Sequence, residues 1–480
     1  MTALALTWMA FPFGAGFAVS LLPRLGKHLA LSGAVFSALF SARLFADPAP
    51  TTLTLMGRFG VTLMLDPLAG FFILTNALVT AAVVLYCWRA DRTSFFFAQV
   101  LMLHGSVNAA FSCSDFISLY VALEVLGIAA FLLIAHPRND RAVWVGLRYL
   151  LVGNVAMLFY LVGAVLVYST THSFRFEGLG VAPPEAVALI LTGLLVKGGV
   201  FVWGWWLPLT HAESESPVSA LMSGVVVKAG LFSLVRLATL VAAIDPIVRI
   251  LGVGTALLGV GIAVLERDAK RLLAFSTISQ MGFILAAPEV GGFYALTHGL
   301  VKSALFLIVG TLPGRDLGVL RHQPLPFPVW AALVTASFSI SGFPLLSGFG
   351  AKVLTMKNLL PWQVIAMNLA ALGTAACFAR FIFLPHRKPA EGEGSADAPG
   401  FWAAMGLLLG GLLAANAVYY DAYAMENVVK PLLTIALAWG LHGLVLRRAA
   451  FRVPRGPERL EHLTGMMSLS LCLLFWLALA

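Results

Sequence analysis

Charged residues are scarce in this sequence. Asp, Glu, Lys and Arg make up 11% of its 480 residues, against about a quarter in ordinary soluble domains. Hydrophobic residues make up 60%, and apolar stretches of about 18 or more residues follow one another. This composition excludes a soluble domain and predicts an all-α integral membrane protein, which we expect to cross the cell (plasma or inner) membrane many times.

Cysteine is also rare. Cys87, Cys113, Cys377 and Cys472 are scattered within or at the ends of apolar segments. Their spacing matches neither a disulfide framework nor a metal site, so we expect ordinary core residues and no metal. A removable signal peptide is not expected either, because the N-terminus lacks a basic region and a small-residue cleavage site; residues 3–22 are predicted to be a retained first span.

The formal net charge of +9 comes from basic residues in short loops between apolar segments. In such loops Lys and Arg orient membrane spans, so we expect no nucleic-acid partner. When successive loops are assigned to opposite sides of the membrane, most of these basic residues fall on one side, which is the predicted inner side. Both termini then lie outside. This pattern supports about sixteen spans, near residues 3–22, 28–46, 67–88, 95–112, 116–136, 143–169, 184–207, 217–237, 246–265, 271–288, 292–312, 329–344, 362–384, 401–418, 428–446 and 463–480.

Two loops have a character of their own. Residues 51–65, TTLTLMGRFGVTLML, alternate apolar with small or polar residues and predict a short outer hairpin. Residues 386–400, HRKPAEGEGSADAPG, predict a flexible inner linker.

Ionisable residues inside apolar runs are the most informative feature of the chain. They are Glu124, Lys197, Lys228, Lys302 and Lys352. Placing a charge in a membrane costs roughly 2.5–3.5 kcal/mol on insertion scales, so each residue needs a partner, internal water or a task. We interpret the series as a proton path.

Three stretches of the sequence carry a family resemblance. They are HGSVNAAF (104–111) with DFISLYVALEV (115–125); LVKGG (195–199), WLP (206–208), PVSAL (217–221) and VKAG (227–230); and DAKRLLAFS (268–276), SQMG (279–282), HGLVK (298–302) and GFPLLSGFGAK (342–352). In this order they resemble the antiporter-like membrane subunits shared by Mrp cation/proton antiporters, respiratory complex I and membrane hydrogenases. The part from Asn108 to Asp115 is most similar to the D-type subunit of Mrp.

The resemblance implies an architecture. We expect a core of about 14 helices with two inverted five-helix repeats and interrupted helices, followed by about two extra C-terminal spans. The predicted divisions are N-terminal helices with the hairpin (1–94), a first repeat (95–237), a second repeat (245–384), the linker (386–400) and C-terminal helices (401–480).

Glu124 and Lys197 form a candidate switch. Desolvation makes the protonation of a lysine sensitive to its neighbours, so the carboxylate would decide whether the lysine keeps its proton. A static buried ion pair that ties two helices together is the alternative.

Glycine and proline suggest helix breaks beside two of the lysines. Gly198 and Gly199 follow Lys197, and Pro344, Gly348 and Gly350 precede Lys352. Interrupted helices are tolerated in membranes where protein or water satisfies the freed backbone groups, although close helix packing also explains single glycines. In the repeat arrangement, Lys197 and Lys352 occupy equivalent positions and Lys228 bridges the halves.

Histidines complete the predicted path. His298 and Lys302 share one helix face at i and i+4, and His298 is a relay candidate because histidine titrates near neutrality. His104 and His211 are weaker candidates for proton uptake, and a satisfied core histidine is the plainer interpretation of each. Asp115 is predicted to cap the helix that carries Glu124.

The resemblance implies a proton-translocating, D-like subunit of a multisubunit Mrp-type antiporter that exchanges protons for Na⁺ or K⁺. Such a subunit is a transporter part and not an enzyme, works with other subunits in the bilayer and needs no cofactor. The alternative is the corresponding subunit of a redox-driven complex, a complex I relative or a membrane hydrogenase. An independent carrier is a third interpretation, disfavoured because no solute-pocket signature accompanies the lysines.

The sequence departs from the family pattern in two places. Residues 211–217, HAESESP, contain two acids where relatives have small residues and proline. The last two spans extend beyond the fourteen of a D-type subunit. The spans after residue 400 carry no mid-depth acid or lysine, so we expect them only to anchor the chain, with the basic loop Arg447–Arg459 reaching anionic lipid or a neighbouring subunit.

Overall fold

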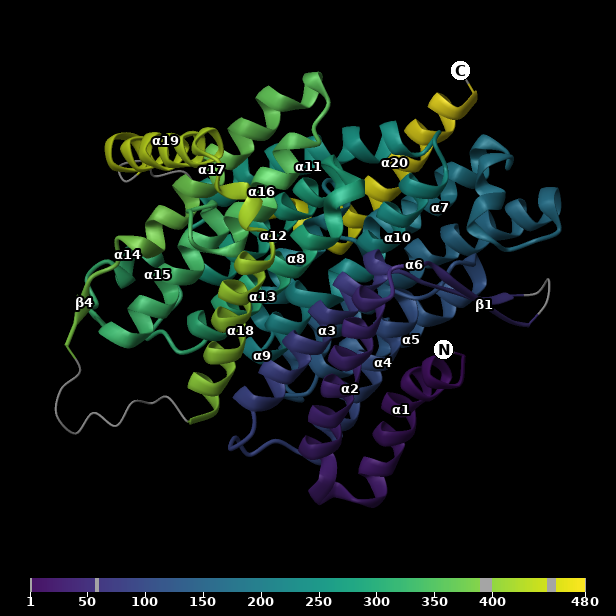
Figure 1. Cartoon of the computed structure of the whole chain (residues 1–480), viewed down its shortest axis with the longest axis horizontal. Helices are drawn as coiled ribbons and strands as arrows, with labels where there is room; N and C mark the ends of the chain where they lie inside the picture. Colours follow the sequence, from purple (N-terminus) through teal and green to yellow (C-terminus); the bar gives the residue numbers. More distant parts are fainter. Residues whose placement is uncertain (1, 57–59, 389–398, 447–454, 480) are drawn as a thin grey trace.

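The computed structural model describes residues 2–56, 60–388, 399–446 and 455–479, and most of them are helical (Figure 1). The helices are α1 (Thr2–Leu21), α2 (Gly26–Ala46), α3 (Pro67–Tyr86), α4 (Ser94–Ala110), α5 (Phe116–Ile134), α6 (Asp140–Thr171), α7 (Pro184–Lys197), α8 (Trp206–Glu213), α9 (Ser216–Leu221), α10 (Val227–Leu240), α11 (Asp245–Leu265), α12 (Ala269–Ala286), α13 (Gly291–Val309), α14 (Leu317–Leu320), α15 (Phe327–Ser341), α16 (Ser347–Lys357), α17 (Val364–Ile382), α18 (Pro399–Val418), α19 (Met425–Leu441) and α20 (Leu460–Leu479).

Short elements connect these helices. The 3-10 turns are η1 (Pro23–Leu25), η2 (Phe176–Gly180), η3 (Trp203–Trp205), η5 (Pro288–Val290), η6 (Pro361–Gln363), η7 (Tyr420–Tyr423) and η9 (Gly456–Glu458), the π-helical turns are η4 (Met222–Val226) and η8 (His442–Leu446), and the strands are β1 (Thr51–Met56), β2 (Gly60–Leu65), β3 (Leu325–Pro326) and β4 (His386–Arg387).

The helices fit the predicted spans. Among the described residues, 10 helices are long and apolar enough to cross a membrane. The remaining predicted spans fall on α4, α12, α19, α20 and two interrupted pairs, α7 with α8 and α15 with α16. The predicted all-α membrane fold is therefore confirmed, and the chain is a multi-pass membrane protein.

Two spans form the centre of the molecule. Residues 217–238 and 291–309 of these spans are buried throughout, whereas the helices at the periphery expose apolar side chains such as Phe17 and Leu158. An apolar residue on an outer helix can face lipid, but a charged residue on a central span must be satisfied inside the protein. Lys228 and Lys302 lie on these two central spans.

The predicted hairpin is present. Strands β1 and β2 pair antiparallel from Thr51 opposite Leu65 to Met56 opposite Gly60, and residues 57–59, including the predicted turn glycine Gly57, lie outside the described residues. Asp115 holds this hairpin against α5: its Oδ2 accepts from Thr62 N at 2.7 Å and its Oδ1 accepts from Ser118 N at 2.7 Å. The predicted helix cap is thus confirmed, and it also fixes where α5 starts.

The C-terminal helices pack on separate parts of the molecule. Helix α19 packs against α17, and α20 packs against α7 and α6 (Figure 1). Most of the predicted linker (389–398) and most of the basic loop (447–454) lie outside the described residues, but β4 at the linker's start pairs with β3. Cys87, Cys113 and Cys377 are buried as predicted, whereas Cys472 is exposed, because α20 is a peripheral helix with an outward face.

Candidate functional site

Glu124 and Lys197 lie together, as the sequence predicts. Glu124 is on α5 and Lys197 is the last residue of α7, with 3.6 Å between Oε1 and Nζ. The lysine is buried, and its Nζ also donates to Leu123 O at 3.4 Å, whereas 23% of the glutamate side chain is exposed. The two groups attract each other without a close hydrogen bond, a geometry from which either side chain can turn away.

The helix that carries Lys197 is interrupted, as predicted. Helix α7 ends at Lys197, and Gly199 adopts a φ of 62° that favours glycine. Trp206 Nε1 donates to Val196 O at 2.9 Å, so a side chain satisfies a carbonyl at the break. A cavity of about 10 Å³ touches Lys197, Tyr149 and Gly153, which is about the space that one water needs.

Lys228 meets His298 in the centre of the molecule. The lysine Nζ donates to Ser223 O at 3.0 Å and lies 3.1 Å from His298 Nδ1. Immediately before Lys228 the helix widens into the π-helical turn η4 (Met222–Val226), a local distortion that is frequent at functional sites. No pattern in the sequence signalled this turn.

His298 and Lys302 share α13 but have different neighbours. Lys302 Nζ donates to Leu273 O at 3.0 Å and to Ser276 Oγ, both on α12, and lies 5.2 Å from the centre of the Phe378 ring. His298 Nε2 has no hydrogen-bond partner within the described part of the chain. Residues one helical turn apart therefore connect α13 to α10 on one side and to α12 on the other.

Lys352 follows the second interrupted helix. Helix α15 ends at Ser341, Gly342 adopts a φ of 85°, and α16 begins at Ser347. The Lys352 Nζ is buried, has no hydrogen-bond partner among the described residues, and lies 5.5 Å from the centre of the Phe283 ring. The interruptions beside both lysines are thus confirmed.

Two cavities meet at Lys352. One of about 10 Å³ is shared with His298, and the other, of about 220 Å³, extends between α16, α17 and α19. Asn368, Asn427, Lys430 and Thr434 contribute polar groups to the larger cavity. The sequence predicted only an anchoring role for the C-terminal extension, but the structure places α19 in the wall of a cavity that reaches Lys352.

The two weaker histidine candidates have different environments. His104 is buried in a polar network, with Ser37 Oγ at 2.8 Å, Thr80 Oγ1 at 3.1 Å and Asn108 Nδ2 at 3.2 Å from its ring nitrogens. His211 is buried, neither of its ring nitrogens is hydrogen-bonded to a described residue, and it stacks on Phe306 at 4.7 Å between centroids. His104 therefore has the contacts of a satisfied core histidine.

Several buried polar contacts were not predicted from the sequence. Arg236 forms a bidentate ion pair with Asp66, and Tyr294 donates to Gln280 Oε1 at 2.6 Å between α13 and α12. Lys270 donates to Ser214 O at 2.8 Å. The sequence shows that polar residues interrupt the apolar runs of α10 and α12. It does not show their partners when these lie more than 100 residues away, as Asp66 does from Arg236.

A family profile decides the classification. The profile described as NADH:quinone oxidoreductase/Mrp antiporter, TM matches residues 113–378, which contain every lysine of the series and Glu124. The chain belongs to this family. The family resemblance seen in the sequence is thereby confirmed, and the match spans both interrupted helices.

Relatives within the NADH:quinone oxidoreductase/Mrp antiporter family come from both kinds of complex. The chain is 31% identical over 366 residues to the N-type NADH-quinone oxidoreductase subunit of Desulforudis audaxviator, covering 68% of this chain and 72% of that one. It is 28% identical over 327 residues to the D-type Na(+)/H(+) antiporter subunit of Alkalihalophilus pseudofirmus, covering 61% of this chain and 66% of that one.

Two solved structures share the fold. A chain of the membrane-bound sulfane sulfur reductase, an archaeal respiratory complex, has a TM-score of 0.76 at 22% identity and covers 92% of this chain, with 99% of its own length aligned. A chain of the Mrp complex from Dietzia sp. has a TM-score of 0.75 at 23% identity, covering 98% of this chain and 59% of that one. Membership of the family thus leaves both kinds of complex open.

Proposed function

We propose that the chain is a proton-translocating subunit of a multisubunit membrane complex, with Glu124, Lys197, Lys228, His298, Lys302 and Lys352 as the proton-carrying groups. One observation carries the proposal. The four lysines of the series are buried on α7, α10, α13 and α16, and of these four only Lys197 has an acid in ion-pair contact among the residues that the structure describes. Lysines buried without a fixed counter-charge suit a group that gains and loses its proton in a working cycle.

The contacts suggest an order of events. While Glu124 faces Lys197, attraction keeps the proton on the lysine; when the carboxylate turns away, the proton can move on. Lys228 and His298 are in direct contact at 3.1 Å, so a proton can pass between α10 and α13 without a carrier. His298 then shares a cavity with Lys352, where one water can complete the connection.

We further propose that residues 95–237 and 245–384 are inverted repeats. Lys197 stands at the break between α7 and α8, and Lys352 follows the break between α15 and α16. Each would serve one half-channel, with Lys228 between them. The cavity that joins Lys352 to α19 supports an outlet on the predicted outer side.

The finer proposal is a D-like component of an Mrp-type cation/proton antiporter. Similarity to the D-type Na(+)/H(+) antiporter subunits of Alkalihalophilus pseudofirmus and Bacillus subtilis supports it. The second candidate is the membrane subunit of a redox-driven complex, which the 31% identity to an N-type oxidoreductase subunit favours. In either complex the same lysines would move protons, and the difference lies in what drives them.

Purification with native partners separates the two candidates. The chain is tagged, extracted in mild detergent, and its partners are identified by mass spectrometry. Small hydrophobic antiporter subunits, together with proton movement driven by a Na⁺ or K⁺ gradient in proteoliposomes, support the antiporter. Iron–sulfur subunits and proton movement that requires electron transfer support the redox complex, and a chain that functions alone contradicts both.

Gly153 tests the mobility of Lys197. A methyl group added there would lie 3.1 Å from the lysine Nζ, so Gly153→Ala should restrict the amine and slow proton transport by about tenfold, the effect of about 1.4 kcal/mol. The matched control is Gly261→Ala on α11, where an added Cβ meets nothing within 4 Å. Transport rates of the two reconstituted variants are compared; equal rates would show that Lys197 needs no room to move.

Thr434 tests the outer cavity. Thr434→Leu places an apolar side chain in the wall of the cavity that reaches Lys352, so we expect proton release to slow several-fold, by about 1 kcal/mol in the barrier. Thr7→Leu is the matched control, because both hydroxyls donate to the carbonyl four residues earlier on an exposed helix face. Unchanged transport in Thr434→Leu would place the outlet elsewhere.

A further inference from the structure

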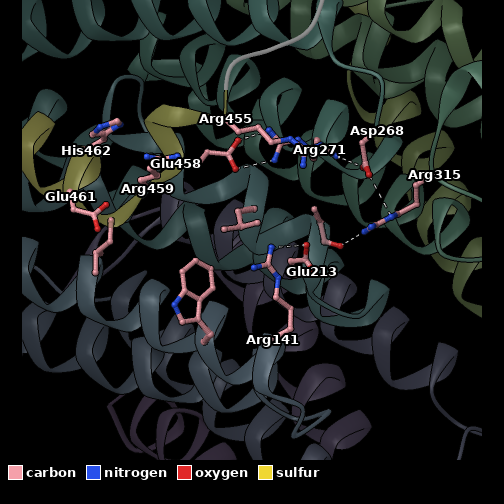
Figure 2. Close-up of a pocket in the computed structure, with 14 residues that line it drawn as sticks. Arg141, Glu213, Asp268, Arg271, Arg315, Arg455, Glu458, Arg459, Glu461 and His462 are labelled. Carbon is pink, nitrogen blue, oxygen red and sulfur yellow. Dashed lines mark hydrogen bonds and ion pairs between the residues drawn. The ribbon is translucent and has the colours of Figure 1, made fainter.

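A large pocket lies where α6, α8, α12 and the C-terminal segment meet, away from the lysine series (Figure 2). Its volume is about 730 Å³. The residues that line it are Arg141, Trp144, Leu209, Ala212, Glu213, Asp268, Arg271, Arg315, Arg455, Glu458, Arg459, Leu460, Glu461 and His462. The predicted topology places these helix ends at the inner membrane surface.

Three of the pocket's arginines are held by acids. Arg141 pairs with Glu213 at 3.2 Å, Arg315 with Asp268 at 3.5 Å, and Arg271 with both oxygens of Glu458. The last pair is buried on both sides and fixes the C-terminal segment to α12. These ion pairs hold side chains of the pocket wall in place without a ligand.

Arg455 and Arg459 are different. Both are exposed, and neither has an ion-pair or hydrogen-bond partner for its side chain within the described part of the chain. Figure 2 shows them on either side of Glu458, whereas Glu461 lies at the far edge of the pocket. Two exposed guanidinium groups beside a cavity suit a phosphate, which accepts several charge-assisted hydrogen bonds.

Apolar surfaces lead from the pocket along the helices. On α6, Trp144 at the rim is followed by Leu147 and Leu151, all 44–51% exposed. On α20, which begins at the pocket, Leu469 is 74% exposed and lies within the depth of one leaflet. A ligand with a phosphate at the membrane surface and hydrocarbon chains below it would contact the pocket and both helices together.

We propose that this pocket binds the phosphate of an acidic phospholipid headgroup through Arg455 and Arg459, and that the bound lipid adds to the Arg271–Glu458 pair in holding the C-terminal segment onto the rest of the molecule. The apolar surfaces on α6 and α20 favour a lipid over free phosphate as the source. Basic pockets between spans at the inner surface are a general mode of headgroup recognition.

Thermal unfolding of the purified complex tests the proposal. The complex is measured in phosphatidylcholine nanodiscs with and without phosphatidylglycerol, and in phosphatidylcholine nanodiscs with inorganic phosphate. Phosphatidylglycerol should raise the unfolding temperature of the wild type. In Arg455→Gln/Arg459→Gln this increase should disappear, and native mass spectrometry should show at least about tenfold weaker phosphatidylglycerol binding, as expected when charge-assisted hydrogen bonds are lost.

The control pair is Arg24→Gln/Arg89→Gln, which removes the same charge from exposed positions on the predicted inner side, outside the pocket. It should keep the response to phosphatidylglycerol; an equal loss would show general surface attraction and overturn the site. Equal protection by inorganic phosphate would support phosphate binding but overturn the lipid as its source. A co-purified protein that crosslinks to Arg459→Cys and blocks lipid binding would overturn the proposal in favour of a protein partner.

Discussion

Glu124→Gln and Lys197→Ala are each expected to abolish proton-coupled transport in a complex that still assembles. Glutamine keeps the shape of the glutamate but removes the charge that attracts Lys197 Nζ from 3.6 Å. Without that attraction the buried lysine loses the group that controls its protonation. Removal of Lys197 leaves Glu124 without its ion-pair partner. Transport is measured as gradient-driven proton movement in proteoliposomes.

Assembly distinguishes this loss from a folding defect. The yield of complex and its unfolding temperature should stay near wild type for Glu124→Gln, because Glu124 Oε1 accepts no hydrogen bond from the residues that the structure describes. Gln323→Ala, a change outside the lysine series, controls for losses during purification and reconstitution. Wild-type transport in assembled Glu124→Gln would support the static ion pair, the alternative that the sequence left open.

Lys352→Arg is expected to lose transport although it retains a positive charge. A guanidinium group does not deprotonate in a protein, so an arginine at the junction of the two cavities cannot pass a proton from His298 towards α19. The loss should approach that of Lys352→Ala, which removes the amine entirely. The measurement is again gradient-driven proton movement, with complex yield as the control.

Lys357→Arg provides the matched comparison. Lys357 lines the same outer cavity but lies at the end of α16, where it is exposed, so arginine should be tolerated there. Normal proton movement through assembled Lys352→Arg would identify Lys352 as a structural cation. That result would remove the outer half of the proposed path and leave the Glu124–Lys197 switch untouched.

Local sequence was sufficient for much of the fold. Apolar runs defined the spans, Asp115 indicated the start of α5, and Gly198, Gly199 and Pro344 marked real interruptions. Gly348 and Gly350, also taken as break signals, lie within α16. Each of these features depends on a few neighbouring residues, because helix caps and breaks are decided by local backbone chemistry.

Features that depend on distant partners could not be predicted. The contact between Lys228 and His298 joins residues 70 positions apart, and the Arg271–Glu458 pair joins residues 187 apart. The π-helical turn before Lys228 could not be predicted either, since its residues have no distinctive composition. The outer cavity needs α16, α17 and α19 together, so the contribution of the C-terminal extension became visible only in three dimensions.

The complete enclosure of the two central spans also determines which properties of a membrane can reach the lysines. Lys228, His298 and Lys302 stand on stretches, residues 217–238 and 291–309, that are buried throughout, so hydrocarbon chains do not touch the parts of the helices that carry them. A change in bilayer thickness meets the peripheral helices first, and these can tilt to adapt. The central groups should therefore keep the same electrostatic surroundings in membranes of different thickness.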